Sequence, residues 1–315
     1  MSDGEPIRFD GEVAIVTGAG HGLGRSYALA LAARGAAVVC NDFVAERAEE
    51  TAKEIAQHGG SAVAETSSVA TPTGGTAIVN AAIDAFGSVE IVINNAGQLR
   101  NAAFEDLPAE HWEEVIATHL DGAFYVTQPA YRHMKAAGYG RIIFASSAAG
   151  MFGLPWQANY GAAKAGLVGL CNVVALEGAP YGITANAIMP MALTGMGAGG
   201  PPPYSPDELQ NMTELFRPIA RVMTAENVAP FVAYLASRRC VETGRIFSIG
   251  CGHIARAFVG ATHGWYASDL QNLTPEQVAS NFDAACDLGE FTVPETAHDE
   301  IRYITEHRPG AGHSA

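Results

Sequence analysis

The chain has 315 residues, of which 48% are hydrophobic and 16% charged, and its formal net charge is −15 at pH 7. This composition supplies a sizeable core and excludes an intrinsically disordered chain. The negative charge argues against nucleic acid and anionic membrane surfaces as partners, because both repel a protein of the same sign. The length exceeds that of a typical domain, so we expect one large domain with an appendage.

The cysteines and the N-terminus bear on the compartment. The five cysteines form no Cys-x-x-Cys pair, and an odd number is typical of reduced, unpaired thiols. Residues 1–10 lack the charged and apolar segments of a signal peptide. No run of about 18 apolar residues predicts a membrane span. We therefore expect a cytoplasmic protein, and we expect no metal site.

Short β-branched segments alternate with Ala-rich stretches of helical pattern. The expected strands are Val13–Thr17, Ala37–Asn41, Ser61–Thr66, Val89–Asn94, Arg141–Ala145, Ile183–Ile188 and Arg245–Ile249. The expected helices are Gly24–Arg34, Ala45–His58, Thr76–Phe86, Ala109–Ala137 and Asn159–Glu177. This alternation predicts an α/β fold with a parallel sheet and helices on both faces. Ligands bind such sheets beyond the carboxyl ends of the strands, where the strand order reverses.

The segment 191–218 breaks the alternation. It contains Gly-Met-Gly-Ala-Gly-Gly-Pro-Pro-Pro, which is incompatible with helix or central strand. Because the segment follows a strand end, where sites form, we interpret it as a mobile flap over the site. A solvent-exposed linker is the alternative.

A tail follows residue 252, so we divide the chain into a dinucleotide-binding domain over 1–252 and an extension over 253–315. A helix is predicted over 275–287, with Thr274 as its N-cap, Pro275 at the first position and Gln277 completing a capping box. Its apolar residues recur at helical spacing. We expect the extension to pack on the same domain or on a partner subunit.

A glycine-rich loop follows the first expected strand and opens the first helix. Its sequence is Thr17-Gly18-Ala19-Gly20-His21-Gly22-Leu23-Gly24. Glycines let the backbone turn tightly and approach a pyrophosphate, whose charge the helix N-terminus favours. The strand before and the helix after meet the condition that this motif requires. An ordinary glycine-rich turn is the alternative.

The second strand is followed by Asp42, eighteen residues past Gly24. A carboxylate there accepts hydrogen bonds from the adenosine ribose hydroxyls and repels a 2′-phosphate. No Arg or Lys accompanies His21 in the glycine loop. We therefore predict NAD as the cofactor over NADP, with an ordinary loop acid as the alternative role of Asp42.

Tyr160 and Lys164 are four residues apart on an expected helix and so share one face. A free tyrosine has a pKa near 10, and a neighbouring ammonium together with a positive nicotinamide ring would lower it. Ser147 follows the fifth strand, and its hydroxyl would hold the substrate oxygen while Tyr160 takes the proton. A Tyr-x-x-x-Lys pair alone is usually a surface feature. The glycine loop and the serine favour catalysis.

These motifs together resemble the short-chain dehydrogenase/reductase superfamily. Thr-Gly-x-x-x-Gly-x-Gly occurs at 17–24, Asn-Asn-Ala-Gly at 94–97, and the Ser and Tyr-x-x-x-Lys set at Ser147, Tyr160 and Lys164. The resemblance covers about residues 10–250. It implies a seven-stranded Rossmann-like, doubly wound sheet, assembly into homodimers or homotetramers, and hydride transfer with Tyr160 as acid and base. It also implies that Lys164 holds the nicotinamide ribose.

The resemblance further implies a set of cofactor-binding positions. They are Gly18, Gly20, His21, Gly22, Leu23, Gly24, Asp42, Ser68, Val69, Asn95, Ala96, Gly97, Tyr160, Lys164 and Leu193. Ser68 replaces an aspartate that is frequent in the adenine pocket. The backbone of Leu193 would meet the nicotinamide amide. His119 replaces an asparagine that holds a proton-relay water in many members, and it keeps a donor and an acceptor. A structural histidine is the alternative.

Within the superfamily the chain resembles the dehydrogenase unit of multifunctional enzyme type 2. The matching stretches are VVCND at 38–42, NNAGQLR at 94–100, HL at 119–120, QANYGAAK at 157–164 and GCGHI at 250–254, together with the tail. This branch oxidises (3R)-hydroxyacyl-CoA and is also described as a 17β-hydroxysteroid dehydrogenase. No hydratase or sterol-carrier domain follows, and the chain does not end in Ser-Lys-Leu, so we expect a free-standing version.

The predicted reaction is therefore the NAD-dependent oxidation of a secondary alcohol, namely a (3R)-hydroxyacyl-CoA with a steroid-derived acyl group as one option. Arg100, Arg217 and Arg221 are the candidates for binding CoA phosphates, with ordinary surface arginines as the alternative. The acidic composition favours instead a 17β-hydroxysteroid or other small alcohol. A dinucleotide-sensing binding protein is the non-enzymatic alternative, which the complete set of catalytic residues disfavours.

Overall fold

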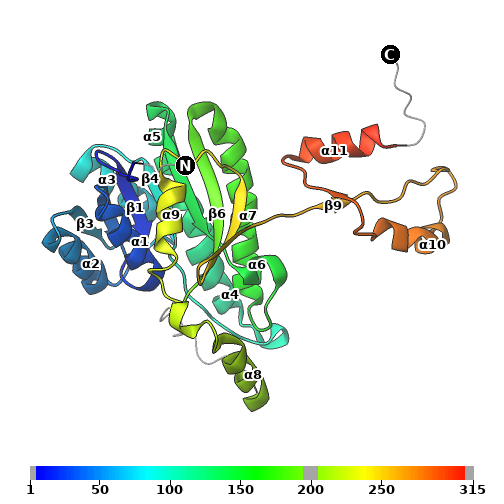
Figure 1. Ribbon diagram of the computed structural model, residues 1–315, viewed down its shortest axis with the longest axis horizontal. Helices are drawn as coiled ribbons and strands as arrows, with labels where there is room; N and C mark the ends of the chain where they lie inside the picture. The colour runs from blue at the N-terminus through cyan, green and yellow to red at the C-terminus, as the bar shows by residue number, and fades with distance from the viewer. Residues whose placement is uncertain (1–4, 194–204, 309–315) are drawn as a thin grey trace. The chain divides into compact units, whose positions relative to one another are not determined.

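The computed structural model describes residues 5–193 and 205–308. It divides into two compact units, one up to Arg256 and one from Ala257 onward. The ribbon follows the chain in colour from the first unit to the second (Figure 1). The central part of the predicted flap, residues 194–204, lies outside the described residues.

A single sheet crosses the first unit in the order β3-β2-β1-β4-β5-β6-β7-β8. The strands are β1 (Val13–Thr17), β2 (Ala37–Asn41), β3 (Ser61–Glu65), β4 (Ile91–Asn94), β5 (Gly140–Ala145), β6 (Ile183–Met191), β7 (Arg245–Gly250) and β8 (His253–Ala257). The pairs from β3 through β7 are all parallel. β1, β4 and β5 are buried along their whole length, because helices cover both faces of a parallel sheet.

The eighth strand is a correction to the expected seven. β8 follows β7 after only Cys251 and Gly252, whose φ angles are 53° and 76°. A two-residue connection joins antiparallel neighbours, whereas parallel strands need a long crossover. The sheet therefore ends in an antiparallel edge strand. The sequence concealed this hairpin because a non-glycine residue occupies the first left-handed position.

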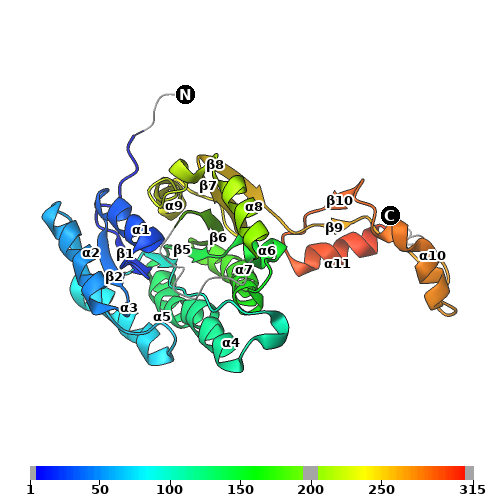
Figure 2. The ribbon, with the colours of Figure 1, turned by 90° about the horizontal axis from the view of Figure 1, so that it is seen from below.

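Two helical layers enclose the sheet (Figure 2). One layer contains α1 (Gly22–Ala32), α2 (Ala45–Gln57) and α9 (Ala229–Ala236), and the other contains α3 (Pro72–Phe86), α5 (Gly122–Ala137) and α7 (Ala158–Gly178). The shorter helical elements of this unit are η1 (Phe104–Asp106), α4 (Ala109–Ile116), η2 (Ala117–Asp121), α6 (Ala148–Phe152), η3 (Ala179–Tyr181), α8 (Pro206–Phe216) and η5 (Ala220–Val222). The doubly wound α/β prediction is confirmed.

The helix predicted over 109–137 is interrupted. Its middle, η2, is a π-helical turn between α4 and α5. Such turns are rare, and they occur frequently at functional sites. The apolar pattern continues through the turn, so the sequence alone did not reveal it.

Helix α8 lies within the segment 191–218, after the glycine and proline run on which the flap prediction rested. Ser205 caps α8 by accepting from the backbone of Glu208, and the Glu208 side chain accepts from the backbone of Ser205. Pro206 occupies the first helical position. This is the same signal that predicted the helix after Thr274, and the glycine and proline run upstream obscured it.

Helix α7, continued by η3, is long and apolar enough to cross a membrane by length and composition alone. In the structure it packs along β6, and it carries the buried polar residues Asn159, Tyr160 and Lys164. We therefore assign it to the core of the first unit, in keeping with the expectation of no membrane span.

The second unit contains the antiparallel pair β9 (Ala261–Thr262) and β10 (Phe291–Thr292), with α10 (Pro275–Ala285) and α11 (Ala297–Glu306). The predicted helix after Thr274 is confirmed with its capping box, and α11 begins with a second one. Neither helix buries a residue. The exposed apolar side chains of this unit are Phe258, Val259, Leu270, Leu273, Val278, Phe282, Leu288, Phe291, Ile301 and Ile304.

Candidate active site

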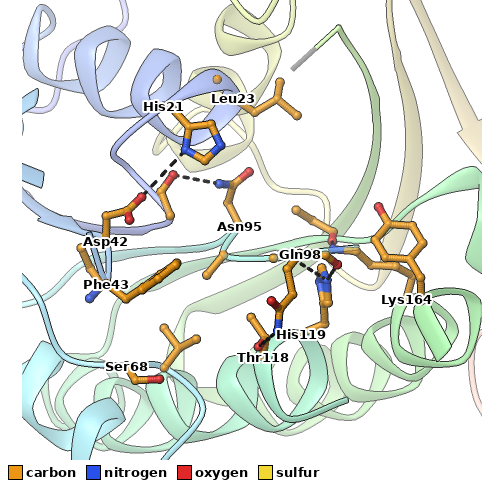
Figure 3. A pocket seen from close by; sticks show the side chains of 18 of the residues that line it. His21, Leu23, Asp42, Phe43, Ser68, Asn95, Gln98, Thr118, His119 and Lys164 are labelled. Atoms are coloured by element: carbon orange, nitrogen blue, oxygen red, sulfur yellow. Dashed lines mark hydrogen bonds and ion pairs between the residues drawn. The ribbon is translucent and has the colours of Figure 1, made fainter. Parts of the chain in front are cut away.

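The strand order reverses between β1 and β4, and the site lies at the carboxyl ends of the strands there. Segments that leave β1, β2, β4, β5 and β6 line a pocket of about 260 Å³ (Figure 3). Its lining residues are Gly18, His21, Gly22, Leu23, Asn41, Asp42, Phe43, Ser67, Ser68, Val69, Asn95, Ala96, Gly97, Gln98, Thr118, His119, Ala145, Ser146, Tyr160, Lys164 and Pro190. Most of the predicted cofactor positions are therefore brought together.

The glycine loop is built so that only glycine fits. Gly18 and Gly22 have φ angles of +65° and +53°. A Cβ atom on Gly24 would lie 2.1 Å from the carbonyl oxygen of Gly18. No side chain caps the start of α1, and no acidic residue lies in its first turn. The helix N-terminus therefore suits the pyrophosphate of a dinucleotide.

Asp42 is buried beside this loop. Its Oδ2 accepts from the backbone N–H of Gly20 at 3.1 Å, and its Oδ1 accepts from that of Val44 at 3.0 Å. A Cβ atom on Gly20 would lie 2.6 Å from Oδ2, so the glycine is needed for this approach. The carboxylate is thereby fixed at the pocket wall, and its remaining lone pairs suit ribose hydroxyls.

The adenine side of the pocket contains Ser68 and Val69, as expected. Ser68 is exposed, and its Oγ accepts from the backbone N–H of Ala70 at 3.3 Å. Val69 is buried. Sequence reasoning missed Phe43, which lines the same pocket with 78% of its surface exposed. Its position directly after Asp42 was the available signal.

Asn95, predicted to lie against the cofactor, lines the pocket, but its side chain is hydrogen bonded to the glycine loop. Its Nδ2 donates to the carbonyl oxygen of Thr17 at 3.1 Å. The backbone N–H groups of Asn95 and Ala96 both donate to Thr17 Oγ1 at 3.0 Å. These bonds join the end of β4 to the glycine loop, so Asn95 shapes the loop.

Ser147 and Tyr160 meet at the other end of the site. Ser147 caps α6, with its Oγ accepting from the backbone N–H of Ala149 at 3.2 Å. The Ser147 side chain lies close enough to the Tyr160 hydroxyl to lower the pKa of the phenol. Both line a second pocket of about 280 Å³, whose other residues are Leu99, Ala148, Ala149, Phe152, Gly153, Leu154 and Gln157. Tyr160 lines both pockets and so connects the cofactor side to an apolar groove.

The prediction that Lys164 and a bound nicotinamide ring together lower the phenol pKa stays a prediction, and burial opposes it. Burial raises the pKa of Tyr160, and only the side chain of Ser147 opposes this rise. Burial also lowers the pKa of Lys164 to about 7. The Lys164 Nζ donates to the carbonyl oxygen of Ala145 and lies 5.4 Å from the centre of the Tyr160 ring. Desolvation therefore dominates both groups.

His119 lies against Tyr160, with the two ring centres 5.2 Å apart and the planes at 86°. Its Nε2 lies 2.8 Å from the carbonyl oxygen of Gln98 and 3.0 Å from its backbone nitrogen. Its Nδ1 is buried without a partner among the described residues. Burial, followed by the charge of Lys164, holds the pKa of His119 well below its ordinary value, so the ring is neutral.

Leu193 is not among the described residues that line the pocket, and its expected role toward the nicotinamide amide stays a prediction. Its backbone N–H donates to the carbonyl oxygen of Met223 at 2.8 Å, so that amide is already bonded. Pro190 reaches the pocket from the end of β6 instead. Only the carbonyl of Leu193 is left to meet a nicotinamide amide. This outcome depends on the 219–223 segment, which sequence reasoning had not placed.

Five further polar residues line the pocket and were missed: Asn41, Ser67, Gln98, Thr118 and Ser146. The Ser146 hydroxyl donates to the carbonyl oxygen of Lys164 at 2.7 Å and so anchors α7 to the end of β5. Its position next to Ser147 was the only sequence signal. Within residues 5–193 and 205–308, no group of three His, Cys, Asp or Glu side chains is placed to bind a metal ion.

The doubly wound fold with this site fits an oxidoreductase, and the comparisons with known proteins agree on that class. The family model described as short chain dehydrogenase matches residues 12–198. The chain belongs to this family.

Its relatives include multifunctional enzymes. Peroxisomal multifunctional enzyme type 2 of Mus musculus is 39% identical over 313 residues, which cover 96% of this chain and 40% of the relative. A putative short-chain type dehydrogenase/reductase of Mycobacterium tuberculosis is 43% identical over 253 residues, which cover 78% of this chain and 84% of the relative. The full-length type 2 enzyme of Drosophila melanogaster has a similar structure, with a TM-score of 0.78, 33% identity and coverage of 95% of this chain and 50% of that one. The chain thus spans half or less of these multifunctional relatives.

Proposed function

We propose that this protein oxidises a secondary alcohol to a ketone with NAD, and that the alcohol is a (3R)-hydroxyacyl-CoA. The observation that carries the proposal is the place of Tyr160. Its side chain lines both the pocket that contains Asp42 and the apolar groove, which it shares with Ser147. Substrate alcohol and nucleotide therefore meet at one phenol.

The chain's own residues have distinct tasks in this reaction. Ser147 binds the alcohol oxygen, and Tyr160 takes its proton. The pocket that contains Asp42 would hold NAD, which would supply the hydride acceptor. Lys164 orients the nicotinamide ribose from the same helix face as Tyr160. The neutral ring of His119 keeps Nδ1 as a donor or acceptor, so we propose that it passes the proton onward.

The preference for NAD rests on Asp42. We expect the Asp42→Ala variant to bind NADH about 10- to 100-fold more weakly, because hydrogen bonds to a charged group contribute roughly 1.5–3 kcal/mol. Its affinity for NADPH should rise, since the repulsion of the 2′-phosphate is removed. Fluorescence titration with both nucleotides measures the ratio. Asp84→Ala, at an exposed position on α3, is the matched control. An unchanged ratio would assign Asp42 a purely structural role.

The three arginines that are candidates for binding CoA phosphates differ in their ion pairs. Arg100 is engaged by Glu114, with 2.9 Å between Nε and Oε2. Arg217 and Arg221 are exposed, and neither has an ion pair within the described part of the chain. Arg221 lies in η5, next to Met223, whose carbonyl bonds Leu193 at the end of β6. We therefore favour Arg217 and Arg221.

The second candidate function is the oxidation of a 17β-hydroxysteroid or another small alcohol. The apolar groove beside Tyr160 favours it, because Phe152 and Leu154 are 74% and 46% exposed there and no charged side chain lines the groove. Such exposed apolar side chains suit the body of a neutral substrate.

Initial rates of NAD reduction decide between these substrates. We expect turnover of (3R)-hydroxyacyl-CoA, none of the (3S) form, and a raised KM for the CoA substrate alone in an Arg217→Ala, Arg221→Ala variant. Turnover of a free steroid alcohol without turnover of either CoA form would refute the CoA assignment. Nucleotide binding without turnover of any alcohol would favour the dinucleotide-sensing alternative.

We also propose a homo-oligomer in which the second unit packs on its own domain or on a partner subunit. Val173 and Leu176 of α7 are 53% and 52% exposed, and no residue of α10 or α11 is buried. These apolar surfaces favour association. The mass in solution, by light scattering, tests the oligomer, and a monomer would contradict it.

The proposed location is the cytoplasm, although the names of several relatives say peroxisomal. The five cysteines are unpaired, which suits a reducing compartment. Cell fractionation would test this location, and enrichment in an oxidising compartment would contradict it.

A further inference from the structure

The side chain of Gln98 joins the segment after β4 to the end of α4. Its Nε2 donates to the carbonyl oxygen of Glu114 at 3.2 Å and to Thr118 Oγ1 at 3.0 Å. Thr118 Oγ1 in turn donates to the same Glu114 carbonyl at 2.9 Å. The close-up shows Gln98 between Thr118 and His119 (Figure 3). One amide group thus contacts both the last turn of α4 and the π-turn η2.

The π-turn needs such support. A π-helical turn is rare, and its backbone hydrogen bonds join residues five positions apart instead of four. Here it carries His119 to the edge-on contact with Tyr160. The main chain of Gln98 bonds His119 Nε2, while its side chain bonds Glu114 and Thr118. Gln98 therefore contacts His119 itself and Thr118, the residue before it in the turn.

The neighbouring glycine shows how tightly this contact is built. A Cβ atom on Gly97 would lie 2.1 Å from His119 Cε1. The ring of His119 is consequently trapped between the segment after β4 and the ring of Tyr160. A small movement of the turn would displace the imidazole from the phenol and let water reach it.

We propose that Gln98 is a positioning residue for the proton-transfer site, because its side-chain amide holds the π-turn that presents His119 to Tyr160. This inference rests on the proposed function. Loss of the Gln98 side-chain amide should therefore lower kcat, because the imidazole of His119 would no longer be held against the phenol of Tyr160.

The direct test is the Gln98→Leu variant, whose side chain is one atom shorter and lacks the amide that donates both hydrogen bonds. Two hydrogen bonds of about 0.5–1.5 kcal/mol each support a loss of roughly tenfold in kcat. Gln128→Leu is the matched control, because Gln128 is exposed on α5 and its side chain bonds only Arg132 at 3.4 Å. Equal kcat values for the two variants would overturn the proposal.

The pH profile supplies a readout that a merely structural role would not move. Tyr160 and Lys164 face His119 from α7, and Glu114 on α4 is paired with Arg100. Entry of water should raise the pKa of His119 toward its ordinary value in Gln98→Leu. Protonation beside Lys164 would then stop the relay, so kcat should fall as the pH drops below about 6.5. Gln128→Leu should show no such fall.

An NMR titration of the His119 ring separates failure of this proposal from failure of the proposed function, because it needs no turnover. We expect the pKa of His119 to rise in Gln98→Leu and in Thr118→Val, and to stay low in Gln128→Leu. Thr118→Val also serves if Gln98→Leu does not fold. The effects of the two variants on kcat should be less than additive when combined, because both remove the hydrogen bond between Gln98 and Thr118. An unmoved His119 titration, or full additivity, would overturn the proposal.

Discussion

The Tyr160→Phe variant should lose turnover by roughly 10²- to 10⁴-fold, which is the usual contribution of a positioned general acid or base. The substitution removes only the hydroxyl that lies close to Ser147. The ring remains to pack against His119 and to line both pockets. Nucleotide binding should therefore persist, so the loss falls on kcat. Stopped-flow rates of NAD reduction, together with NADH titration, measure both quantities.

The control for this variant is Tyr234→Phe. Tyr234 lies on α9 with 40% of its surface exposed, away from both pockets. It should keep wild-type kcat. Near-normal turnover by Tyr160→Phe would exclude the phenol as the proton acceptor. The site would then need another base, and Lys164 and His119 are the two titratable side chains placed nearby.

The Lys164→Met variant should show opposite effects on activity and stability. Its turnover should fall by at least about a hundredfold, because the nicotinamide ribose and Tyr160 lose their cationic neighbour. Its free energy of unfolding at pH 6 should nevertheless rise by about 1–3 kcal/mol. Lys164 is 4% exposed, and a buried ammonium destabilises the fold unless it is well paired. Its only hydrogen bond in the structure is the one to the Ala145 carbonyl.

The pH dependence of this gain follows from the direction of the pKa shift. Folding lowers the pKa of Lys164 from 10.5 to about 7. Between these values the unfolded chain binds more protons than the folded one, so wild-type stability rises with pH across that window. The destabilisation is complete below pH 7 and absent above about pH 10.5. The advantage of Lys164→Met should therefore shrink as the pH increases.

Urea denaturation at pH 6 and pH 10 measures both variant and wild type. Lys135→Met is the matched control, because Lys135 is exposed on α5 and its ammonium lies over the Tyr181 ring at 4.2 Å. It should change the free energy of unfolding by less than about 0.5 kcal/mol. A Lys164→Met protein that is less stable than wild type at pH 6 would contradict the dominance of desolvation at this site.

Local sequence patterns were sufficient for the framework of the site. The glycine loop is recognisable from consecutive residues. The positive φ angle of Gly18 and the close approach of Gly24 to the carbonyl oxygen of Gly18 each require glycine at one position. Tyr160 and Lys164 share a face because helical spacing alone requires it. Asp42 follows β2, whose β-branched residues predict a buried strand, and the structure shows that strand buried. The parallel sheet follows from the alternation of strands and helices.

The tertiary structure decided what surrounds these motifs. The contact of Gln98 with His119 joins residues 21 positions apart, across two elements that only the strand order brings together. The bond from Leu193 to Met223 is of the same kind.

Burial raises the pKa of Tyr160 and lowers that of Lys164, and no spacing rule predicts burial. The sequence by itself determined which residues carry the chemistry, because those motifs are local. Packing determined the pKa values of these residues and the hydrogen bonds that hold them in place. Desolvation and long-range hydrogen bonds arise only when distant segments meet.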